Sequence, residues 1–352
     1  MKFERTFDHK LPTALLAIDR IADGPVLAAC FDGVYRVDPR DGAGERIGGH
    51  QSYCSGVRAL SETRFVTSGY DGRLLWWDLG EPEPVRELPL HGFWSWELAR
   101  SPDGRLLASV TGQYLAGSYR YDPAESDEPT VRVVDAETGE VVGSYSMLPS
   151  VQAVAFSPDS RFVAAGNLMG QVRVWDIASG ELKADIKSED FTSWGIIKSH
   201  CYIGGIHALR FSPDGERVIA AGMGPMRDPM AGNGKQRWQE FAWTEPGAPK
   251  VRETKEDQAG EGLMEALEFT GDGSAFLMAG RLRGGNWNAA LFDFASGDRI
   301  ADMKSGYRIT DVVYDQQLEE FWVAGTQGQP DRLKDDGTFA WFGRLERYKL
   351  VP

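Results

Sequence analysis

Cysteine and long apolar stretches are both scarce in this sequence of 352 residues. Cys30, Cys54 and Cys201 are an odd number, lie far apart and form no C-x-x-C pair, so neither a disulfide framework nor a zinc site is indicated. No apolar run approaches the roughly 18 residues that cross a bilayer. Because residues 1–10 are too charged for a signal peptide, we expect a cytoplasmic protein, the alternative being an exported one whose signal is missing.

Positive charge is also limited. The chain carries 38 Lys and Arg residues against 52 Asp and Glu residues, which gives a net charge of −14 and a pI near 4.9. Proteins that neutralise phosphates need clustered cations and usually a basic pI. The composition therefore argues against nucleic acid and anionic membranes as partners.

Glycine, by contrast, is abundant, with 41 residues, and it marks a repeated turn. Ser101-Pro102-Asp103-Gly104, Ser157-Pro158-Asp159-Ser160 and Ser212-Pro213-Asp214-Gly215 lie 56 and 55 residues apart, each between two alternating apolar stretches. Pro presets φ for a type I turn, and the Ser and Asp side chains bond to nearby backbone groups. Each tetrapeptide is thus predicted to join two antiparallel strands.

A second repeated signal closes the third strand of most units. Apolar or aromatic residues are followed there by Asp, and a Gly or Pro turn comes next: Val37-Asp38, Trp77-Asp78, Val134-Asp135, Trp175-Asp176 and Phe292-Asp293. Histidines at positions 9, 50 and 91 recur at a spacing of 41 residues near the ends of fourth strands. The sequence is therefore a repeat of four-stranded units, which calls for an all-β fold.

These motifs resemble the WD-repeat family, whose unit begins near Gly-His and ends near Trp-Asp. The fullest match runs from Gly49-His50 to Trp77-Asp78. The resemblance implies one domain over residues 1–352, a seven-bladed β-propeller with four antiparallel strands per blade. First strands are expected near Ala14, Gly56, Trp94, Val151, Ile206, Met264 and Ile309. Because an open ring would leave unpaired edges, we expect residues 2–10 to complete the last blade beside the C-terminal strand.

The resemblance also implies a structural tetrad of polar side chains in the second unit. Its members are His50, Thr67 or Ser68, Asp71 and Trp77. A His-Asp-Ser set could also be a catalytic triad, but the tryptophan would block access to the hydroxyl, so a buried hydrogen-bond network is favoured. The fourth unit lacks the histidine and has Met169 in place of the aspartate, and we expect apolar packing there instead.

Long insertions distinguish one end of the units from the other. Gly112–Pro129, Gly224–Lys235, Arg281–Asn286 and Gly325–Gly337 follow second strands, and Ser188–Gly205 follows a fourth strand. In an antiparallel meander these connections lie on one face, which we term the insertion-bearing face. Long connections in a compact repeat fold are frequently functional.

The insertions are rich in aromatic residues, Met and Arg, a mixture typical of protein interfaces. The predicted partner-binding residues are Tyr114, Tyr119, Arg120, Tyr121, Phe191, Trp194, His200, Tyr202, Met226, Arg227, Arg237, Arg281, Arg283 and Trp287. The alternative is that single loop aromatics fold back on the ring as small cores. For the face as a whole we predict binding of a protein or peptide.

Motifs of catalysis or metal binding are absent from the sequence. Gly232-Asn233-Gly234-Lys235 is a poor phosphate loop because Gln236 follows it. We expect a non-catalytic scaffold without metal or cofactor, monomeric by itself or one subunit of a larger complex. The alternative is a propeller hydrolase or lyase with a small-molecule site at the channel mouth, using His200, His207, Arg281 and Arg283.

Overall fold

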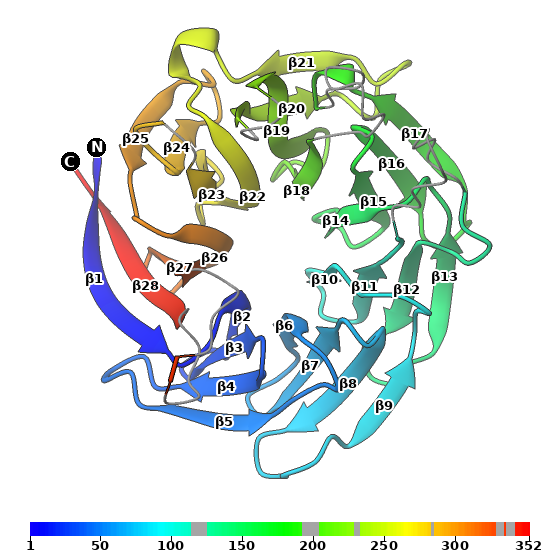
Figure 1. Cartoon of the computed structure of the whole chain (residues 1–352). Coiled ribbons are helices and arrows are strands. Elements are labelled where there is room, and N and C mark those ends of the chain that lie inside the picture. Colours follow the sequence, from blue (N-terminus) through cyan, green and yellow to red (C-terminus); the bar gives the residue numbers. More distant parts are fainter. Residues whose placement is uncertain (114–124, 192–203, 229–232, 283–284, 329–333, 336–341) are drawn as a thin grey trace.

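A computed structural model describes residues 1–113, 125–191, 204–228, 233–282, 285–328, 334–335 and 342–352. The described residues form seven four-stranded antiparallel sheets arranged as blades around a central axis (Figure 1). This is the all-β propeller that the repeat pattern predicts. The only described helices are two single turns, η1 (Glu189–Phe191) and η2 (Glu256–Gln258), and neither is long enough to span a membrane.

The strands follow one order in every blade, from the axis outward. The first strands are β2 (Leu15–Arg20), β6 (Cys54–Ala59), β10 (Glu97–Arg100), β14 (Val151–Phe156), β18 (Gly205–Phe211), β22 (Gly262–Phe269) and β26 (Arg308–Asp315). The second strands are β3 (Val26–Cys30), β7 (Arg64–Gly69), β11 (Leu106–Val110), β15 (Phe162–Asn167), β19 (Val218–Asp228), β23 (Ala275–Leu282) and β27 (Glu320–Gln327). First strands lie nearest the axis in Figure 1.

The two outer positions complete each blade. The third strands are β4 (Gly33–Val37), β8 (Arg73–Asp78), β12 (Val131–Asp135), β16 (Gln171–Asp176), β20 (Asn233–Phe241), β24 (Ala289–Asp293) and β28 (Phe342–Val351). The fourth strands are β5 (Gly44–Gly48), β9 (Arg86–Pro89), β13 (Val141–Tyr145), β17 (Leu182–Lys187), β21 (Lys250–Glu253), β25 (Arg299–Met303) and β1 (Lys2–Leu11).

The last blade combines the two ends of the chain. Strand β1 pairs antiparallel with β28, with Lys2 opposite Val351, and the sheet order is β1-β28-β27-β26. Side chains strengthen this pairing, since Phe7 packs against Trp322 with ring centroids 5.2 Å apart. Arg5 donates to the buried carboxylate of Glu346 at 2.9 Å. The N-terminal strand is therefore a structural part of the ring (Figure 1).

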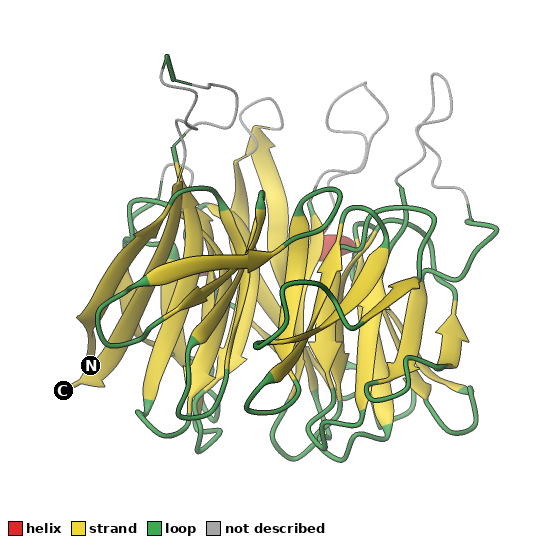
Figure 2. Ribbon diagram, turned by 90° about the horizontal axis from the view of Figure 1, so that it is seen from below, coloured by secondary structure: helices red, strands yellow, loops and turns green. Residues whose placement is uncertain are grey.

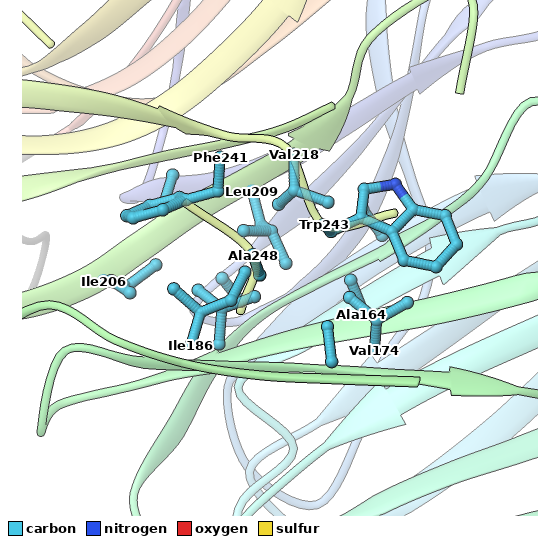
Figure 3. Close-up of a cluster of buried hydrophobic side chains, with 14 of the residues drawn as sticks. Ala164, Val174, Ile186, Ile206, Leu209, Val218, Phe241, Trp243 and Ala248 are labelled. Atoms are coloured by element: carbon cyan, nitrogen blue, oxygen red, sulfur yellow. The ribbon is translucent and has the colours of Figure 1, made fainter. Parts of the chain in front are cut away.

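Hydrophobic side chains fill the space between neighbouring blades. The described residues form seven buried clusters, one at each junction. At the junction of the fourth and fifth blades, Ile186 and Val174 face Leu209 and Phe241 (Figure 3). Burying such side chains contributes about 1.5–3 kcal/mol each. The ring is thus held by packing that no blade can form alone.

The repeated Ser-Pro-Asp turns join first to second strands as predicted. Ser101 Oγ donates to Asp103 at 2.6 Å and accepts from the backbone nitrogen of Leu106, and Gly104 has φ +74°. Equivalent bonds form around Ser157 and Ser212. The acidic residues that end third strands bond the next turn, as Asp135 does by accepting from the nitrogen of Thr138 at 2.7 Å. Local side-chain chemistry therefore sets the strand boundaries on this face.

The opposite face, which is the insertion-bearing face, carries the connections from second to third strands and from one blade to the next (Figure 2). The residues outside the description all fall in connections from second to third strands or from one blade to the next. Part of the expected insertion Gly224–Lys235 is regular strand, because β19 extends to Asp228 and β20 begins at Asn233. The pairing of Met226 with Gly234 continues the ladder beyond the body of the blade.

Polar side chains of the second blade form a continuous chain of hydrogen bonds. Trp77 Nε1 donates to Thr67 Oγ1 at 2.9 Å, and His50 lies 2.8 Å from the same hydroxyl and 2.9 Å from Asp71. Burial would raise the pKa of Asp71, but bonds from His50 and two backbone nitrogens bring it below its ordinary value. An ionised carboxylate only accepts, so His50 Nδ1–H donates to Asp71 and the Thr67 hydroxyl donates to Nε2. Ser68 instead bonds Ser55.

Other blades replace this network with simpler ones. In the third blade His91 bonds Ser109 at 3.0 Å, while its Nδ1 is buried without a partner among the described residues. The fourth blade is not held by apolar packing alone, contrary to expectation. Asn167 is fully buried there, donates to the carbonyl of Leu148 and accepts from the nitrogen of Gln171. A short amide bonds directly to the loop backbone and so replaces the missing histidine and aspartate.

Candidate functional site

Most of the predicted partner-binding residues lie outside the described part of the chain. These are Tyr114, Tyr119, Arg120, Tyr121, Trp194, His200, Tyr202 and Arg283. Met226 and Arg227 belong to strand β19, whose side chains are not described at those positions. Four predicted residues remain whose side chains have a place in the structure: Phe191, Arg237, Arg281 and Trp287.

Phe191 and Trp287 are core residues rather than parts of an exposed face, which corrects their assignment. Phe191 is 0% exposed and belongs to the cluster between the fourth and fifth blades. Trp287 is 3% exposed and packs with Phe292 and Met278 between the fifth and sixth blades. Large apolar side chains near strand ends gain more from burial than from exposure to water, so these two fold back on the ring.

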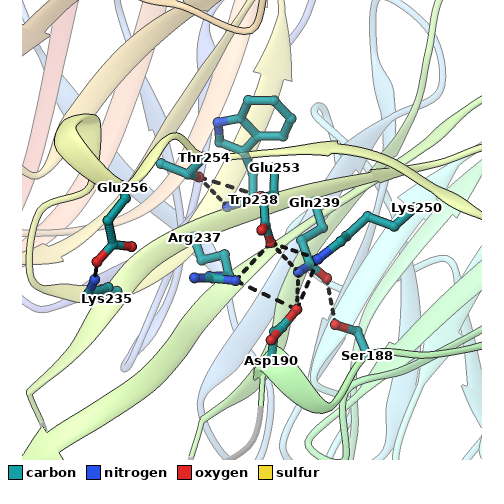
Figure 4. Close-up of polar contacts among 10 residues, drawn as sticks. All are labelled: Ser188, Asp190, Lys235, Arg237, Trp238, Gln239, Lys250, Glu253, Thr254 and Glu256. Carbon is teal, nitrogen blue, oxygen red and sulfur yellow. Dashed lines mark hydrogen bonds and ion pairs between the residues drawn. The ribbon is translucent and has the colours of Figure 1, made fainter.

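Arg237 lies in a charged network at the base of the Ser188–Gly205 connection (Figure 4). Its guanidinium group is 2.8 Å from Glu253 and 3.6 Å from Asp190. Lys250 contacts the same two carboxylates, at 3.0 and 3.2 Å, and Gln239 donates to both. The network joins this connection to the outer strand β21. Arg237 is therefore already engaged within the protein.

Arg281 is exposed and lies beside a cavity of about 490 Å³. Tyr307, Arg308 and Phe31 line the same cavity, which spans the junction of the sixth, seventh and first blades. Of the four described residues, only Arg281 presents its side chain to solvent on the predicted face. It contributes a positive charge at the rim of the channel.

An aromatic ladder that the insertions did not predict runs across the first three blades on this face. Phe31 stacks on Tyr53, with centroids 4.0 Å apart and planes 10° apart, and Tyr70 stacks on Trp94 at 4.5 Å and 4°. Tyr53 and Tyr70 join the two pairs at 5.6 Å. Phe93 and Trp96 extend the ladder by contacts with Trp94. Tyr53 and Trp94 are each 40% exposed, so the ladder is accessible.

Equivalent positions of successive blades produce the ladder. Phe31 and Tyr70 each follow the last residue of a second strand. Tyr53 and Trp94 each lie near the start of the next blade's first strand. Offset-stacked rings of this kind prefer centroid separations of about 4.5–7 Å. The same stacking contact thus recurs at two neighbouring blade junctions.

A β-bulge near the start of the first strands defines the channel mouth. The register skips one residue in six blades, and all six skipped side chains line a cavity of about 210 Å³: Leu16, Ser55, Gln152, His207, Glu265 and Thr310. In the third blade Trp96, the residue before β10, lines the same cavity. Its backbone nitrogen donates to the carbonyl group of Val110. A bulge turns the extra residue out of the ladder. The mouth is therefore lined by one skipped side chain from each of six blades and by Trp96 from the third.

Charged side chains line the mouth and the channel below it. Arg308 donates to Glu265 through two nitrogens, and Arg210 donates to Glu268 at 3.1 Å. Arg58 donates to the carbonyl groups of Val57 and Ile18. Burial lowers the pKa of His207, which favours its neutral form. The cations near the mouth are therefore engaged by carboxylates or by backbone oxygens.

Glu97 and Asp311 occupy equivalent positions of the third and seventh blades, directly after Trp96 and after the skipped Thr310, respectively. Five other blades place Ala or Gly there: Ala17, Gly56, Ala153, Ala208 and Ala266. Glu97 accepts from the nitrogen of Val154 at 2.8 Å, and Asp311 from the nitrogen of Ile18 at 2.9 Å. Burial raises the pKa of Glu97 to about 7, although Arg210 opposes this, and it also raises the pKa of Asp311.

Comparison with known proteins agrees with the repeat fold described above. The family described as "WD domain, G-beta repeat" matches residues 143–176, which run from strand β13 through the last residue of β16. This match includes the second of the Ser-Pro-Asp turns and the Trp175-Asp176 ending. The chain is a seven-bladed propeller with a WD repeat.

Proteins similar to this WD-repeat propeller come from several organisms. Human apoptotic protease-activating factor 1 is 25% identical over 177 residues, which are 49% of this chain and 12% of that protein. Bovine telomerase Cajal body protein 1 is 25% identical over 129 residues, 34% of this chain and 22% of that protein. WD repeat-containing protein SL1-17 of Schistosoma mansoni is 28% identical over 147 residues, 34% and 49% respectively. The matches thus span at most about half the length of these relatives.

The residues of the alternative, a propeller enzyme, are not assembled in the described part of the WD-repeat propeller. His200 and Arg283 lie outside it. His207 lines the cavity of about 210 Å³ at the channel mouth, whereas Arg281 lines the separate cavity of about 490 Å³. Among the described residues, no group of three or more His, Cys, Asp or Glu side chains is arranged to hold a metal ion.

Proposed function

We propose that this WD-repeat propeller is a non-catalytic platform for a protein or peptide partner, which docks on the insertion-bearing face. The aromatic ladder carries the proposal, because rigid and accessible aromatic rings are enriched among the residues that dominate binding energy. Tyr53 and Trp94 remain 40% exposed although burial would stabilise them. Exposed apolar surface of this kind marks interaction sites.

Architecture supports the same conclusion. Seven buried junctions hold the blades, and with them the aromatic ladder, in fixed relative positions. A preorganised binding surface loses little conformational entropy when a partner binds. We further propose that residues 1–352 act as one unit in the cytoplasm, alone or as one subunit of a larger complex. The names of two relatives associate them with apoptotic protease activation and with telomerase, and comparable assembly roles suit this chain.

Affinity capture followed by direct titration tests the proposal. The wild type and a Tyr53→Ala, Trp94→Ala double variant are used to capture proteins from native extract, and each captured protein is then purified and titrated calorimetrically. We expect the double variant to weaken binding by about tenfold or more, since aromatic anchors contribute at least about 1–2 kcal/mol each.

Leu318→Ala provides the matched control, because Leu318 is also 40% exposed but lies in a turn between first and second strands on the opposite face. If the wild type and both variants bind the partner with equal affinity, the partner docks on a different part of the surface. If no protein is captured and metabolites raise the melting temperature instead, the enzyme alternative replaces the platform.

A further inference from the structure

We infer that the docking segment of the partner is basic, and that one of its lysine or arginine side chains enters the channel mouth between the aromatic ladder and Glu97. This inference rests on the proposed function and specifies the chemistry of the partner. Three features of the mouth support it: aromatic rings in its lining, a carboxylate to which no described cation is hydrogen-bonded, and the engagement of the existing arginines.

Aromatic rings connect the exposed ladder to the mouth. Tyr70 and Trp96 line the mouth cavity and also contact each other, with centroids 5.4 Å apart. Trp94 stacks on Tyr70 and is exposed, so the ladder forms a continuous surface from solvent to the cavity. Ring faces carry negative charge and attract a cation within about 6 Å of the centroid. A basic side chain is thus favoured along the whole path.

Glu97 supplies the negative charge at the end of this path. One carboxylate oxygen accepts from the nitrogen of Val154, and the other lies 4.0 Å from Arg210, which is itself bonded to Glu268. Glu97 therefore lines the cavity without a hydrogen-bonded cation among the described residues. Burial raises the pKa of Glu97 even though Arg210 and Arg58 oppose this, so the ionised carboxylate is costly in this site. A guest ammonium or guanidinium group would offset the cost of burying this carboxylate.

The charges of the mouth disfavour an anionic guest. Arg308 at the mouth is already neutralised by Glu265, and Arg58 is bonded to backbone carbonyl groups deeper in the channel. Asp311 adds a third carboxylate to the cavity lining, beside Glu97 and Glu265. The net charge of −14 repels phosphates at longer range, so stacked nucleobases are a poorer match for the ladder than a basic peptide is.

Purely apolar segments fit the ladder but not the mouth. Ser55, Gln152 and His207 present polar groups to the cavity. Covering them with an apolar side chain would remove water from these groups without a replacement hydrogen bond, which is unfavourable. A long side chain with a charged end satisfies both parts of the site, because its methylene groups contact the rings and its end group reaches the carboxylate.

Peptide pools test the inference with the full-length protein. Short immobilised peptides of random sequence, with the central residue fixed as each amino acid in turn, are probed with labelled wild type, Glu97→Gln and Trp94→Ala proteins. We expect the Arg and Lys pools to retain the most wild type, and the signal to fall about fivefold or more in each variant. Added salt should weaken retention.

Glu97→Gln keeps the acceptor for Val154 and the size of the side chain, so its effect isolates the charge. Leu318→Ala is the control on the opposite face and should bind like the wild type. Preference for acidic or apolar pools that Trp94→Ala abolishes would overturn the basic partner while leaving the docking face intact. If no pool is retained, or if Glu97→Gln binds the basic pools as the wild type does, the inference is wrong.

Discussion

Glu97 of the third blade accepts a hydrogen bond from the backbone nitrogen of Val154 in the fourth blade, at 2.8 Å. The same relationship recurs between Asp311 and Ile18 at the junction of the seventh and first blades. Carboxylates in the channel therefore link adjacent blades as well as lining the mouth. Because they are buried, their ionisation has a cost, and this makes the stability of the ring depend on pH.

Ionisation of Glu97 is predicted to destabilise the folded ring. Its folded pKa of about 7 lies above the ordinary value of 4.5. The contribution of the neutral form to stability is therefore complete below pH 4.5 and is lost as the pH rises from 4.5 to 7. The total loss is on the order of 3 kcal/mol. Urea denaturation across this range should show wild-type stability falling relative to Glu97→Gln, and parallel curves would contradict the assignment.

His91 is predicted to act in the opposite direction. Burial, assisted by Arg132, lowers its folded pKa to about 3, from an ordinary value of 6.5. Stability is then complete above pH 6.5 and is lost as the pH falls from 6.5 toward 3, because the unfolded chain binds the proton first. Relative to His91→Gln, the wild type should lose about 1.4 kcal/mol per pH unit in this range. Calorimetric unfolding between neutral and mildly acidic pH measures the difference, and equal slopes would exclude it.

Thr67 is predicted to be the most sensitive polar position of the second blade. Thr67→Val keeps the shape but leaves Trp77 Nε1 and His50 Nε2 buried without a partner. Each unsatisfied group costs about 1–3 kcal/mol, so we expect a loss of about 3 kcal/mol in the free energy of unfolding. Ser68→Ala removes only the bond to Ser55 and should cost about 1 kcal/mol. Similar losses in the two variants would show that the network adds nothing beyond a single hydroxyl.

Removal of residues 1–10 is predicted to destabilise the whole ring. The truncated protein loses the edge pairing along β28 together with the packing of Phe3 on Tyr348 and of Phe7 on Trp322. Two lost aromatic contacts correspond to about 3–6 kcal/mol, before the pairing itself is considered. Thermal unfolding should show a clearly lower midpoint. A peptide of residues 1–11 added in excess should raise the midpoint again, while a scrambled peptide should not.

Seven blades and their turns could be predicted because each depends on chemistry within a few neighbouring residues. Ser157-Pro158-Asp159 contains the side chains that form its turn, and Trp77-Asp78 marks the end of a strand. The aromatic ladder could not be predicted in this way, since its rings come from four separate connections, of which only the one before β10 holds more than one aromatic residue. Its signal was the equivalence of Phe31 with Tyr70, each directly after a second strand, which only an alignment of the blades would reveal.

Whether a side chain is buried is the second property that local sequence patterns do not determine. Phe191 and Trp287 have the composition of an interface, and only the positions of the neighbouring blades decide that they are enclosed. The same holds for Glu97, which looks like an ordinary strand residue until the fold places it in the lining of the mouth. Function in a repeat fold thus depends on departures from the repeat, and these are the positions that a repeat pattern predicts least well.

The bulges of the first strands have a further consequence for how such a ring can change. Each skipped residue faces the channel mouth, while its neighbours in the strand keep their places in the ladder and in the cores between blades. Leu16, Gln152 and His207 differ widely in size and polarity, and the blades that carry them are alike. The residues that line the mouth and those that build the ring are therefore at separate positions, so single substitutions can change the shape and polarity of the mouth while the scaffold stays constant.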